Sequence, residues 1–457
     1  MSFLYSVLGF FLAIGVLVAV HEFGHFWVAR KLGVKVLRFS IGFGKPLWTK
    51  VGGKDQVEYV IAAIPLGGYV KMLGEGDDVG VSEPDAHRAF DRQAIWKRAL
   101  IVLAGPGINF LFAILLFMVL GLNTQQGVKP TFGSLNQQAL IAQAGVSEGD
   151  TLLSVDGRNA DYMMQYDLYI FNQVLKGEDI AIKVRAANAS QEQYRTVVLN
   201  TSDVPIYNIN PSSLMNQLGF VRMSPPANTQ ISQVVPGSAA DRAGLLAGDK
   251  FVSINHIAVN SWYEMVAQIQ PSAGVPLNVV VDRAGSRFEL VVTPEAVDVN
   301  GEKVARMGIG RTPTPYTPEQ IIEINRSPLE ALAYGVERTW LMSTLTLRML
   351  WKMVTLQVSH KNVNGPITIA DVAGQAIQIG WETYVYVLAV ISISLGVMNL
   401  LPIPMLDGGH LLMYSIELVA GKNIAEKAFA VGQRLGVLML ICLMSLAFYN
   451  DIFRLLN

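Results

Sequence analysis

Apolar residues gather in four long runs, which are separated by much more polar sequence. The runs cover residues 4–28, 99–122, 384–401 and 428–448. Each approaches the roughly 20 residues that a helix needs to cross the hydrocarbon core of a bilayer. No basic segment precedes the first run, as it would in a cleavable signal peptide. The pattern predicts a polytopic α-helical membrane protein with four transmembrane helices.

An alternating pattern follows the first run. Residues 34–41 and 57–61 read as short strands, and glycines follow them at 42–44 and 67–68. Strand-like runs that end in glycine are typical of strands joined by turns. We therefore expect a β-hairpin with glycine turns in this segment.

Related blocks recur between the second and the third run. The pattern A-G-x-x-x-G-D occupies residues 144–150 and returns at 243–249, and a strand pattern that ends in a turn follows each copy. Such self-similarity indicates tandem copies of one domain. The sequence predicts two copies of a small β-rich domain, inserted between the second and the third span.

Residues 328–354 have apolar residues at helical spacing, including Trp340 and Leu341. Glu337, Arg338 and further charged residues interrupt them, so this segment is too charged to span a bilayer. A helix with one apolar and one charged face lies in the plane of the membrane interface. We expect an interfacial amphipathic helix before the third span.

Composition and charge agree with a membrane protein that also carries soluble domains. The chain has 457 residues, of which 51% are hydrophobic and 16% charged, and its mean hydropathy is +0.36. These values exceed a soluble norm without being apolar throughout. The net charge of -1 gives no reason to expect nucleic acid as a partner. The expected surroundings are a lipid bilayer.

Basic residues gather after the first run and before the second, and they set the orientation. The cluster consists of Arg30, Lys31, Lys35, Arg38, Lys45, Lys50, Lys97 and Arg98. The positive-inside rule places this loop in the cytoplasm. Both termini and the repeated domains then lie outside, and the C-terminal ends of the first and third spans share the cytoplasmic side.

The first run ends in the motif His21-Glu22-Phe23-Gly24-His25. On a helix, His21 and His25 project from one face, so both imidazoles can bind one Zn²⁺ while Glu22 acts as general base. The alternative is a chance match to this short motif. Ionisable residues in a membrane segment each carry a penalty of about 2.5–3.5 kcal/mol, which favours a functional metal site.

The third run leads from Asn399 into a segment that supplies a third ligand. Its prolines and glycines should unwind the helix and bring Asp407 to the level of the two histidines. A catalytic zinc takes three protein ligands and keeps one open position, and Asp407 completes such a set. His410 is a rival ligand that spacing cannot exclude, and its other interpretation is a polar residue near the start of a cytoplasmic helix.

Taken together, the HExxH motif, Asn399 and Leu406-Asp407-Gly408 resemble the site-2 protease family of intramembrane zinc metalloproteases. The similarity extends over essentially the whole length. It implies that His21, His25 and Asp407 bind one zinc ion and that Glu22 is the catalytic base. It also implies that Asn399 helps to hold the substrate.

The resemblance also gives meaning to the hairpin and the second span. It implies a membrane re-entrant β-hairpin on the cytoplasmic side, where Gly42, Phe43 and Gly44 would hold an unwound substrate as an added strand. The alternative is a hairpin that merely packs under the spans. In the second span, Asn109 either supports the site, as a similar residue does in this family, or satisfies backbone groups freed by Pro106.

The repeated block resembles PDZ domains, which bind peptides by strand addition. Leu218, Gly219 and Phe220 resemble the carboxylate-binding loop of such a domain, at the head of the second copy. The first copy shows no equally clear loop. The resemblance implies that the pair filters substrates by size, whereas the alternative is that both copies only fill space over the site.

The resulting expectation is a bacterial inner-membrane enzyme that cleaves single-pass membrane proteins within or beside the bilayer. The resemblance implies substrates such as an anti-sigma factor already clipped in the periplasm during an envelope stress response, and signal-peptide remnants. A non-catalytic PDZ scaffold and a membrane zinc peptidase of another family remain alternatives. The predicted segments are a first span (1–30), a cytoplasmic loop with the hairpin (31–98), a second span (99–122), two PDZ domains (123–221 and 222–312), an amphipathic helix with connector (313–380), a third span (381–403), a cytoplasmic loop (404–427) and a fourth span (428–450).

Overall fold

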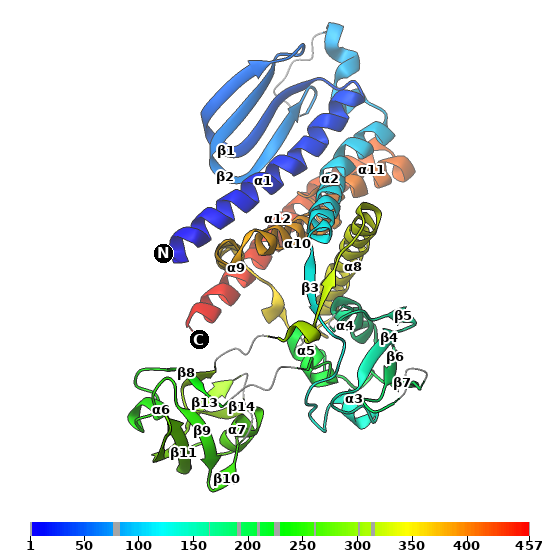
Figure 1. Cartoon of the computed structure of the whole chain (residues 1–457). Helices are drawn as coiled ribbons and strands as arrows, with labels where there is room; N and C mark the ends of the chain where they lie inside the picture. Colours follow the sequence, from blue (N-terminus) through cyan, green and yellow to red (C-terminus); the bar gives the residue numbers. More distant parts are fainter. Residues whose placement is uncertain are drawn as a thin grey trace.

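The computed structural model describes residues 2–75, 83–163, 165–189, 193–207, 211–223, 229–259, 262–299, 302–311 and 316–456. Within these ranges, four helices are long and apolar enough to cross a membrane. They are α1 (Ser2–Lys31), α2 (Ile95–Leu122), α10 (Trp381–Leu400) and α12 (Lys422–Leu456). These helices cover the four apolar runs of the sequence. Figure 1 shows them between a β-hairpin at one end and two small domains at the other.

Glycines allow α1 and α2 to approach closely. A Cβ on Gly24 of α1 would lie only 2.3 Å from the backbone oxygen of Ala104 in α2. Pro106 lies inside α2, but the helix continues to Leu122, so this proline does not end it. On another face of α2, Phe117 packs with Ile393 of α10 in one buried cluster. Helix α2 is therefore the common neighbour of the first and third spans.

The hairpin consists of β1 (Val36–Gly52) and β2 (Val57–Met72). The prediction of turns at its glycine pairs is wrong, because Gly42 and Gly44 lie inside β1 with φ of 95° and 85°. The turn of the hairpin lies at residues 53–56. The backbone conformation at these glycines bends β1, so that residues 38–41 pair with 68–71 as well as with 58–61. The glycines thus fold two long strands into one bent sheet.

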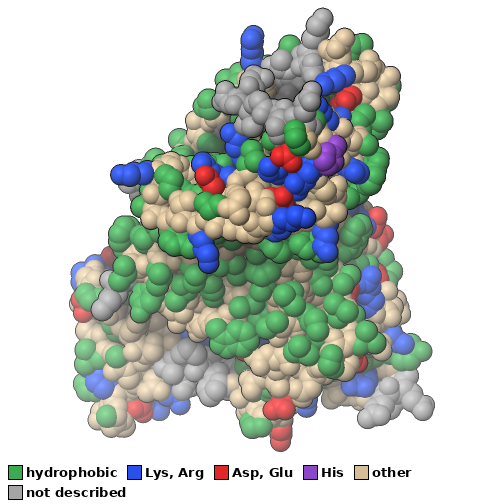
Figure 2. All heavy atoms as spheres, turned by 90° about the horizontal axis from the view of Figure 1, so that it is seen from above, with side chains coloured by type: hydrophobic (Ala, Val, Ile, Leu, Met, Phe, Trp, Pro, Cys, Tyr) green, Lys and Arg blue, Asp and Glu red, His purple; other side chains and the backbone are tan. Residues whose placement is uncertain are grey.

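The hairpin end of the molecule is both apolar and basic on its surface. Its exposed apolar side chains include those of Phe43, Leu47 and Trp48. Figure 2 looks onto this end and shows Lys and Arg side chains above a broad hydrophobic surface. Apolar surface of this extent beside basic residues is typical of a protein region that contacts lipid.

Two small domains follow α2, and each contains a four-stranded sheet. In the first, the order is β5-β4-β6-β7, and in the second it is β10-β9-β11-β12. The identical connectivity agrees with the predicted repeat. The strands are β4 (Thr151–Val155), β5 (Arg158–Asn159), β6 (Ile180–Arg185), β7 (Arg195–Leu199), β9 (Lys250–Ile254), β10 (Ile257–Ala258), β11 (Leu277–Arg283) and β12 (Ser286–Val292).

Short helices and further strand pairs complete these domains. The helices are α3 (Leu140–Gln143), α4 (Asp167–Lys176) and α5 (Pro211–Leu218) in the first domain, and α6 (Ala239–Arg242) and α7 (Trp262–Ile269) in the second. The second domain also contains the pair β8 (Ile231–Val234) with β15 (Ile309–Arg311), and the hairpin β13 (Glu295–Val299) with β14 (Glu302–Arg306). The strands β3 (Gln125–Val128) and β16 (Ile321–Ile324) pair where the chain enters and leaves both domains.

Helix α8 (Pro328–Val354) runs over the whole segment predicted to be amphipathic. Ser327 and Glu330 form a capping box at its start, which satisfies backbone N–H groups of the first turn. A Cβ on Gly335 would lie 2.5 Å from the backbone oxygen of Ile114, so α8 packs directly on α2. Helix α8 thus connects the first small domain with the membrane-spanning helices.

Two further helices lie in segments where only a connector and a loop were expected. They are α9 (Pro366–Ile379) and α11 (Asp407–Ala420). A Cβ on Gly9 of α1 would lie 2.8 Å from the backbone carbon of Ala373, so α9 packs tightly on the first half of α1. Helix α11 begins at the predicted third ligand and therefore fixes part of the site.

Candidate functional site

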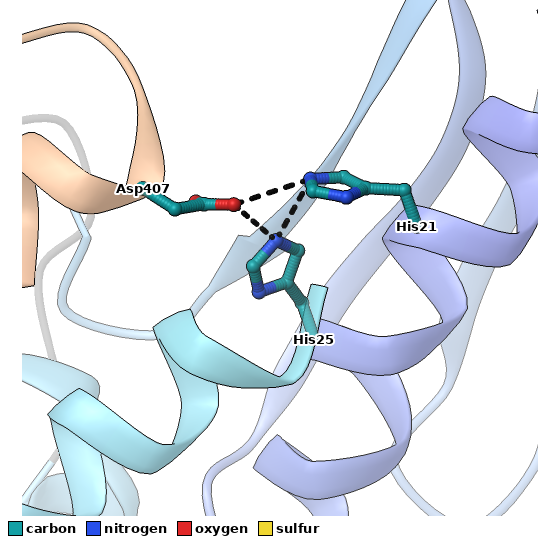
Figure 3. Close-up of side chains that lie close together, drawn as sticks. All are labelled: His21, His25 and Asp407. Carbon is teal, nitrogen blue, oxygen red and sulfur yellow. Dashed lines mark hydrogen bonds and ion pairs between the residues drawn. The ribbon is translucent and has the colours of Figure 1, made fainter. Parts of the chain in front are cut away.

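Three side chains from two distant segments meet between α1 and the start of α11. Nε2 of His21 lies 3.3 Å from Nε2 of His25, and Oδ2 of Asp407 lies 3.3 Å and 3.5 Å from these two atoms. Figure 3 shows both rings and the carboxylate turned toward one point. Within the described residues, this is the one group of three His, Cys, Asp or Glu ligand atoms close enough to hold a metal ion.

The dimensions of this triangle fit a zinc ion. Zn–N and Zn–O bonds of about 2.0–2.1 Å in a tetrahedron separate neighbouring ligand atoms by roughly 3.3–3.4 Å. The three observed separations lie at or close to that value. Oδ2 of Asp407 is buried without a hydrogen-bond partner, and a buried carboxylate oxygen needs a cation or a donor. Two histidines and one carboxylate also form a typical catalytic zinc set.

Both histidines have partners on their second ring nitrogen. Nδ1 of His25 lies 2.8 Å from the backbone oxygen of Ile101, to which an Nδ1–H can donate, and this leaves Nε2 free for a metal. Nδ1 of His21 lies 3.1 Å from Nδ2 of Asn109, whose Oδ1 is buried without a partner. With the proton of His21 on Nδ1, the amide of Asn109 turned by 180° would accept it through Oδ1. The side chain of Asn109 thus lies where it can contact His21, one of the two predicted histidine ligands.

Glycines bring the chain close to these ligands from two sides. A Cβ on Gly105 of α2 would lie 2.2 Å from Nε2 of His25, and a Cβ on Gly408 of α11 would lie 2.2 Å from the backbone oxygen of Leu401. The tight turn from residue 401 to 406 thus delivers Asp407 as the first residue of α11.

Glu22 is buried on α1 and faces the hairpin. Only 8% of its surface is exposed. A Cβ on Gly68 of β2 would lie 2.9 Å from Cγ of Glu22 and 2.6 Å from the backbone oxygen of Ser40. The missing side chain at Gly68 therefore lets an edge of the bent sheet pass directly beside Glu22.

The other residues predicted to bind substrate lie in β1 and in α10. Gly42 and Gly44 flank Phe43 in β1, and the exposed ring of Phe43 stacks on Tyr69 of β2 with 6.1 Å between ring centroids. Asn399 lies half-buried in the last turn of α10. His410 lies in the first turn of α11 and is not part of the three-ligand group.

The assignment of Leu218, Gly219 and Phe220 to the second small domain is wrong. The side chains of Leu218 and Phe220 are buried in the core of the first domain. Gly219 has a φ of 95°, and a Cβ there would lie 3.0 Å from Cβ of Ala139, just before α3. The error arose because the loop that closes the first domain comes after its sheet, close to where the second domain begins.

The equivalent loop of the second domain is Met307, Gly308 and Ile309, which is not among the residues predicted from the sequence. Gly308 has a φ of 80°, and a Cβ there would lie 2.2 Å from Cβ of Ser238, just before α6. Ala139 and Ser238 precede equivalent helices of the repeat. The signal in the sequence is a glycine between two apolar residues that recurs near the end of each copy.

Comparison with known families defines the class of the protein. The profile of peptidase family M50 matches residues 9–443, which is most of the chain. The chain therefore belongs to peptidase family M50, the site-2 protease family, as its motifs predicted. It is a zinc metalloprotease, and this excludes a zinc peptidase of another family and a non-catalytic scaffold.

Several relatives are similar over their full length. A protein of Vibrio cholerae described as a candidate zinc metalloprotease is 39% identical over 456 residues and 99% of each chain. The regulator of sigma-E protease RseP of Escherichia coli is 37% identical over 457 residues, and protease RseP of Yersinia pestis is 38% identical over 459, each covering 100% of both chains. Among solved structures, the PDZ domain of an SdrC-like protein from Listeria monocytogenes covers 20% of this chain at 20% identity, but its TM-score of 0.17 is too low to support an argument about fold.

Proposed function

We propose that His21, His25 and Asp407 hold the zinc ion and that Glu22 is the general base of peptide hydrolysis. When bound, zinc supplies a Lewis acid that polarises the peptide carbonyl and lowers the pKa of a water molecule. Glu22 lies next to His21 in α1, so its carboxylate can take the proton of that water and pass it to the leaving amine. Asn109 and the backbone oxygen of Ile101 keep the two imidazoles in the correct tautomer.

The near-equilateral triangle of ligand atoms is the observation that supports this proposal most directly. Three atoms that zinc prefers lie at tetrahedral spacing, although Asp407 is far from the histidines in sequence. An ordinary structural cluster has no reason to leave a buried carboxylate oxygen without a hydrogen-bond donor.

We infer that the bent sheet holds the substrate in an extended conformation beside Glu22. In the part of the chain that the structure describes, residues 68–71 pair with 38–41, and Gly68 passes next to Glu22. A helical substrate hides its peptide bonds, and an added strand would present them. Phe43 and its two flanking glycines lie in the same sheet, and Asn399 would hold the substrate from the side of α10.

The proposed setting is the bacterial inner membrane, with four spans, both termini in the periplasm and the site near the cytoplasmic side. Basic residues after α1 and before α2 support this orientation by the positive-inside rule. The two small domains would then be periplasmic PDZ domains that admit substrates already shortened outside. Since relatives are named regulators of sigma-E protease, the proposed substrates are single-pass proteins such as an anti-sigma factor in an envelope stress response, and signal-peptide remnants.

Cleavage of a single-pass substrate by the purified protein tests the proposed function. Wild type should cleave an externally shortened substrate much faster than the full-length form, and a zinc chelator should abolish cleavage. Glu22→Gln should bind one zinc ion and remain folded but lose cleavage by at least about 10²-fold, the lower range for general acid–base catalysis. Cleavage by Glu22→Gln at the wild-type rate would refute the assigned base.

A further inference from the structure

The three proposed ligands depend on α2 in different ways. His21 and His25 belong to α1, and their outer ring nitrogens face Asn109 and Ile101 of α2. Asp407 belongs to α11, and no such partner reaches its Oδ2. Something else must therefore fix α11 relative to α2, because a shift of one ångström would break the zinc geometry.

A buried ion pair joins α2 and α11 on the other side of the site. Nη2 of Arg98 donates to Oε1 of Glu417 at 2.7 Å, and the two side chains are only 10% and 11% exposed. The guanidinium of Arg98 also lies 4.8 Å from the ring centroid of Tyr414, which is itself buried. Among the residues that the structure describes, this is the ion pair that joins α11 to α2.

The pair lies on the same face of α11 as Asp407. Tyr414 follows Asp407 by seven residues and lies almost in line with it along α11, and Glu417 follows by ten residues and lies about 80° round the same half of the helix. Ten residues correspond to about 15 Å along the axis. Asp407 and Glu417 therefore mark the two ends of the α11 surface that faces the core.

Stability alone does not explain this arrangement. Nε of Arg98 is buried without a partner, so the guanidinium is incompletely satisfied. Buried ion pairs of this kind often stabilise a fold no better than apolar residues do, and in some proteins they specify which surfaces meet and in which register. The contact is therefore suited to fixing how α11 is aligned on α2.

We propose that the Arg98–Glu417 ion pair positions Asp407 by fixing the rotation and axial register of α11 on α2. Both are positioning residues, since they act through Asp407 and touch neither zinc nor substrate. The inference rests on the proposed role of Asp407 as a zinc ligand. Its consequence is that the affinity and the geometry of the metal site depend on a contact about three helical turns away.

The decisive variant replaces both partners, Arg98→Met with Glu417→Leu, in the purified full-length protein. Removing both charges leaves no unpaired buried ion, so this variant should fold about as well as wild type. We expect its zinc affinity, measured by competition with a chromogenic chelator, to fall by about tenfold or more, as other residues that orient ligands produce. The visible absorption of the Co²⁺-substituted protein should also change. If the double variant does not fold, the same zinc affinity and Co²⁺ absorption are measured on Glu417→Gln, which removes the negative charge but keeps a hydrogen-bond acceptor.

An exposed ion pair provides the matched control. Arg242→Met with Glu295→Leu removes a pair in the second small domain and should leave zinc affinity unchanged. Wild-type zinc affinity and an unchanged Co²⁺ spectrum in the Arg98/Glu417 variant would overturn the inference. Asp407→Asn separates the two claims: if it loses zinc while the Arg98/Glu417 variant does not, only the positioning role fails. If Asp407→Asn itself binds zinc as wild type does, the ligand assignment fails.

Discussion

The two small domains share one strand order but differ in their relation to the rest of the chain. Leu168 of α4 in the first domain enters the buried cluster of α2, α8 and α10. Among the described residues, the core of the second domain consists only of residues between Ile231 and Ile309. A repeated domain has thus become part of the packing of the spans in one copy and has stayed separate in the other.

The cavities beside the equivalent helices α4 and α7 also differ between the two domains. The cavity between α4, β4 and Phe220 is about 10 Å³, whereas the cavity between α7 and β15 is about 420 Å³. Met307, Gly308 and Ile309 line the open cavity. The groove between this helix and the sheet is therefore closed in the first copy and open in the second, while the first copy has a separate cavity of about 460 Å³ beside Ala139 and Leu218.

Placing a charge in the docked helix should have the largest effect. Leu168→Asp would bury an unpaired carboxylate among Phe117 and Ile393, which costs about 3–5 kcal/mol. We expect loss of folded protein and of bound zinc, measured by thermal unfolding and metal content. The matched variant Met265→Asp alters the buried face of α7 and should unfold the second domain while the zinc remains bound. Equal loss of zinc in both variants would contradict the distinction between the copies.

Removing the second domain tests whether the zinc site and the spans depend on it. A chain without residues 229–311 should keep its zinc and its activity on an externally shortened substrate. Cleavage of the full-length substrate should rise at least several-fold, because the proposed filter has lost one half. Gel-based cleavage of both substrates measures this, and unchanged discrimination would show that the first domain alone sets the limit on size.

Alanine at the two equivalent glycines should have a moderate effect. Gly219 and Gly308 both have φ in the left-handed region, where a side chain causes strain of about 1–3 kcal/mol. Gly308→Ala should lower the melting temperature of the second domain and leave cleavage of a shortened substrate intact. Gly219→Ala should destabilise the docked domain together with α8. Opposite results in unfolding experiments would reverse the assignment of the two loops.

The smallest effect concerns pH and the second domain. Burial raises the pKa of Asp249, but hydrogen bonds from Arg283 and from the backbone N–H of Leu246 lower it by more. The pKa of Asp249 therefore lies below its usual value. A carboxyl with a lowered folded pKa stabilises the domain above its unfolded pKa near 4, and this contribution is lost as pH falls through the folded value. Acid unfolding of Asp249→Asn should therefore depend less on pH than that of wild type. An unchanged dependence would exclude this pair as its source.

The sequence predicted those features that depend only on residues close together in the chain. The four apolar runs correspond to α1, α2, α10 and α12, and the helical spacing of His21 and His25 places both on one face. Asp407 needed a topological argument, because it lies 382 residues after His25. In the structure, Asp407 follows the end of α10 and lies beside the two histidines of α1.

The remaining features depend on packing that a sequence does not display. The glycines of β1 read as turns, but tertiary pairing made them bends within a strand. Helices α9 and α11 are short, and they were predicted as a connector and a loop. Both pack on longer helices, α9 on α1 and α11 on α2, and these contacts cannot be read from a local pattern. The loop of Leu218, Gly219 and Phe220 lies near the boundary of the two copies in sequence, and its burial in the first core and the close approach of Gly219 to Ala139 identify its domain.

The metal content of the ligand variants tests the central claim most directly. Purified wild type and His410→Ala should each contain one zinc ion per chain by mass spectrometry, and X-ray absorption should indicate two imidazole nitrogens with oxygen at about 2.0–2.1 Å. Asp407→Ala should lose most of its zinc, because only two protein ligands remain. Full zinc content in Asp407→Ala, together with its loss in His410→Ala, would show that the third ligand is His410 and would contradict the account.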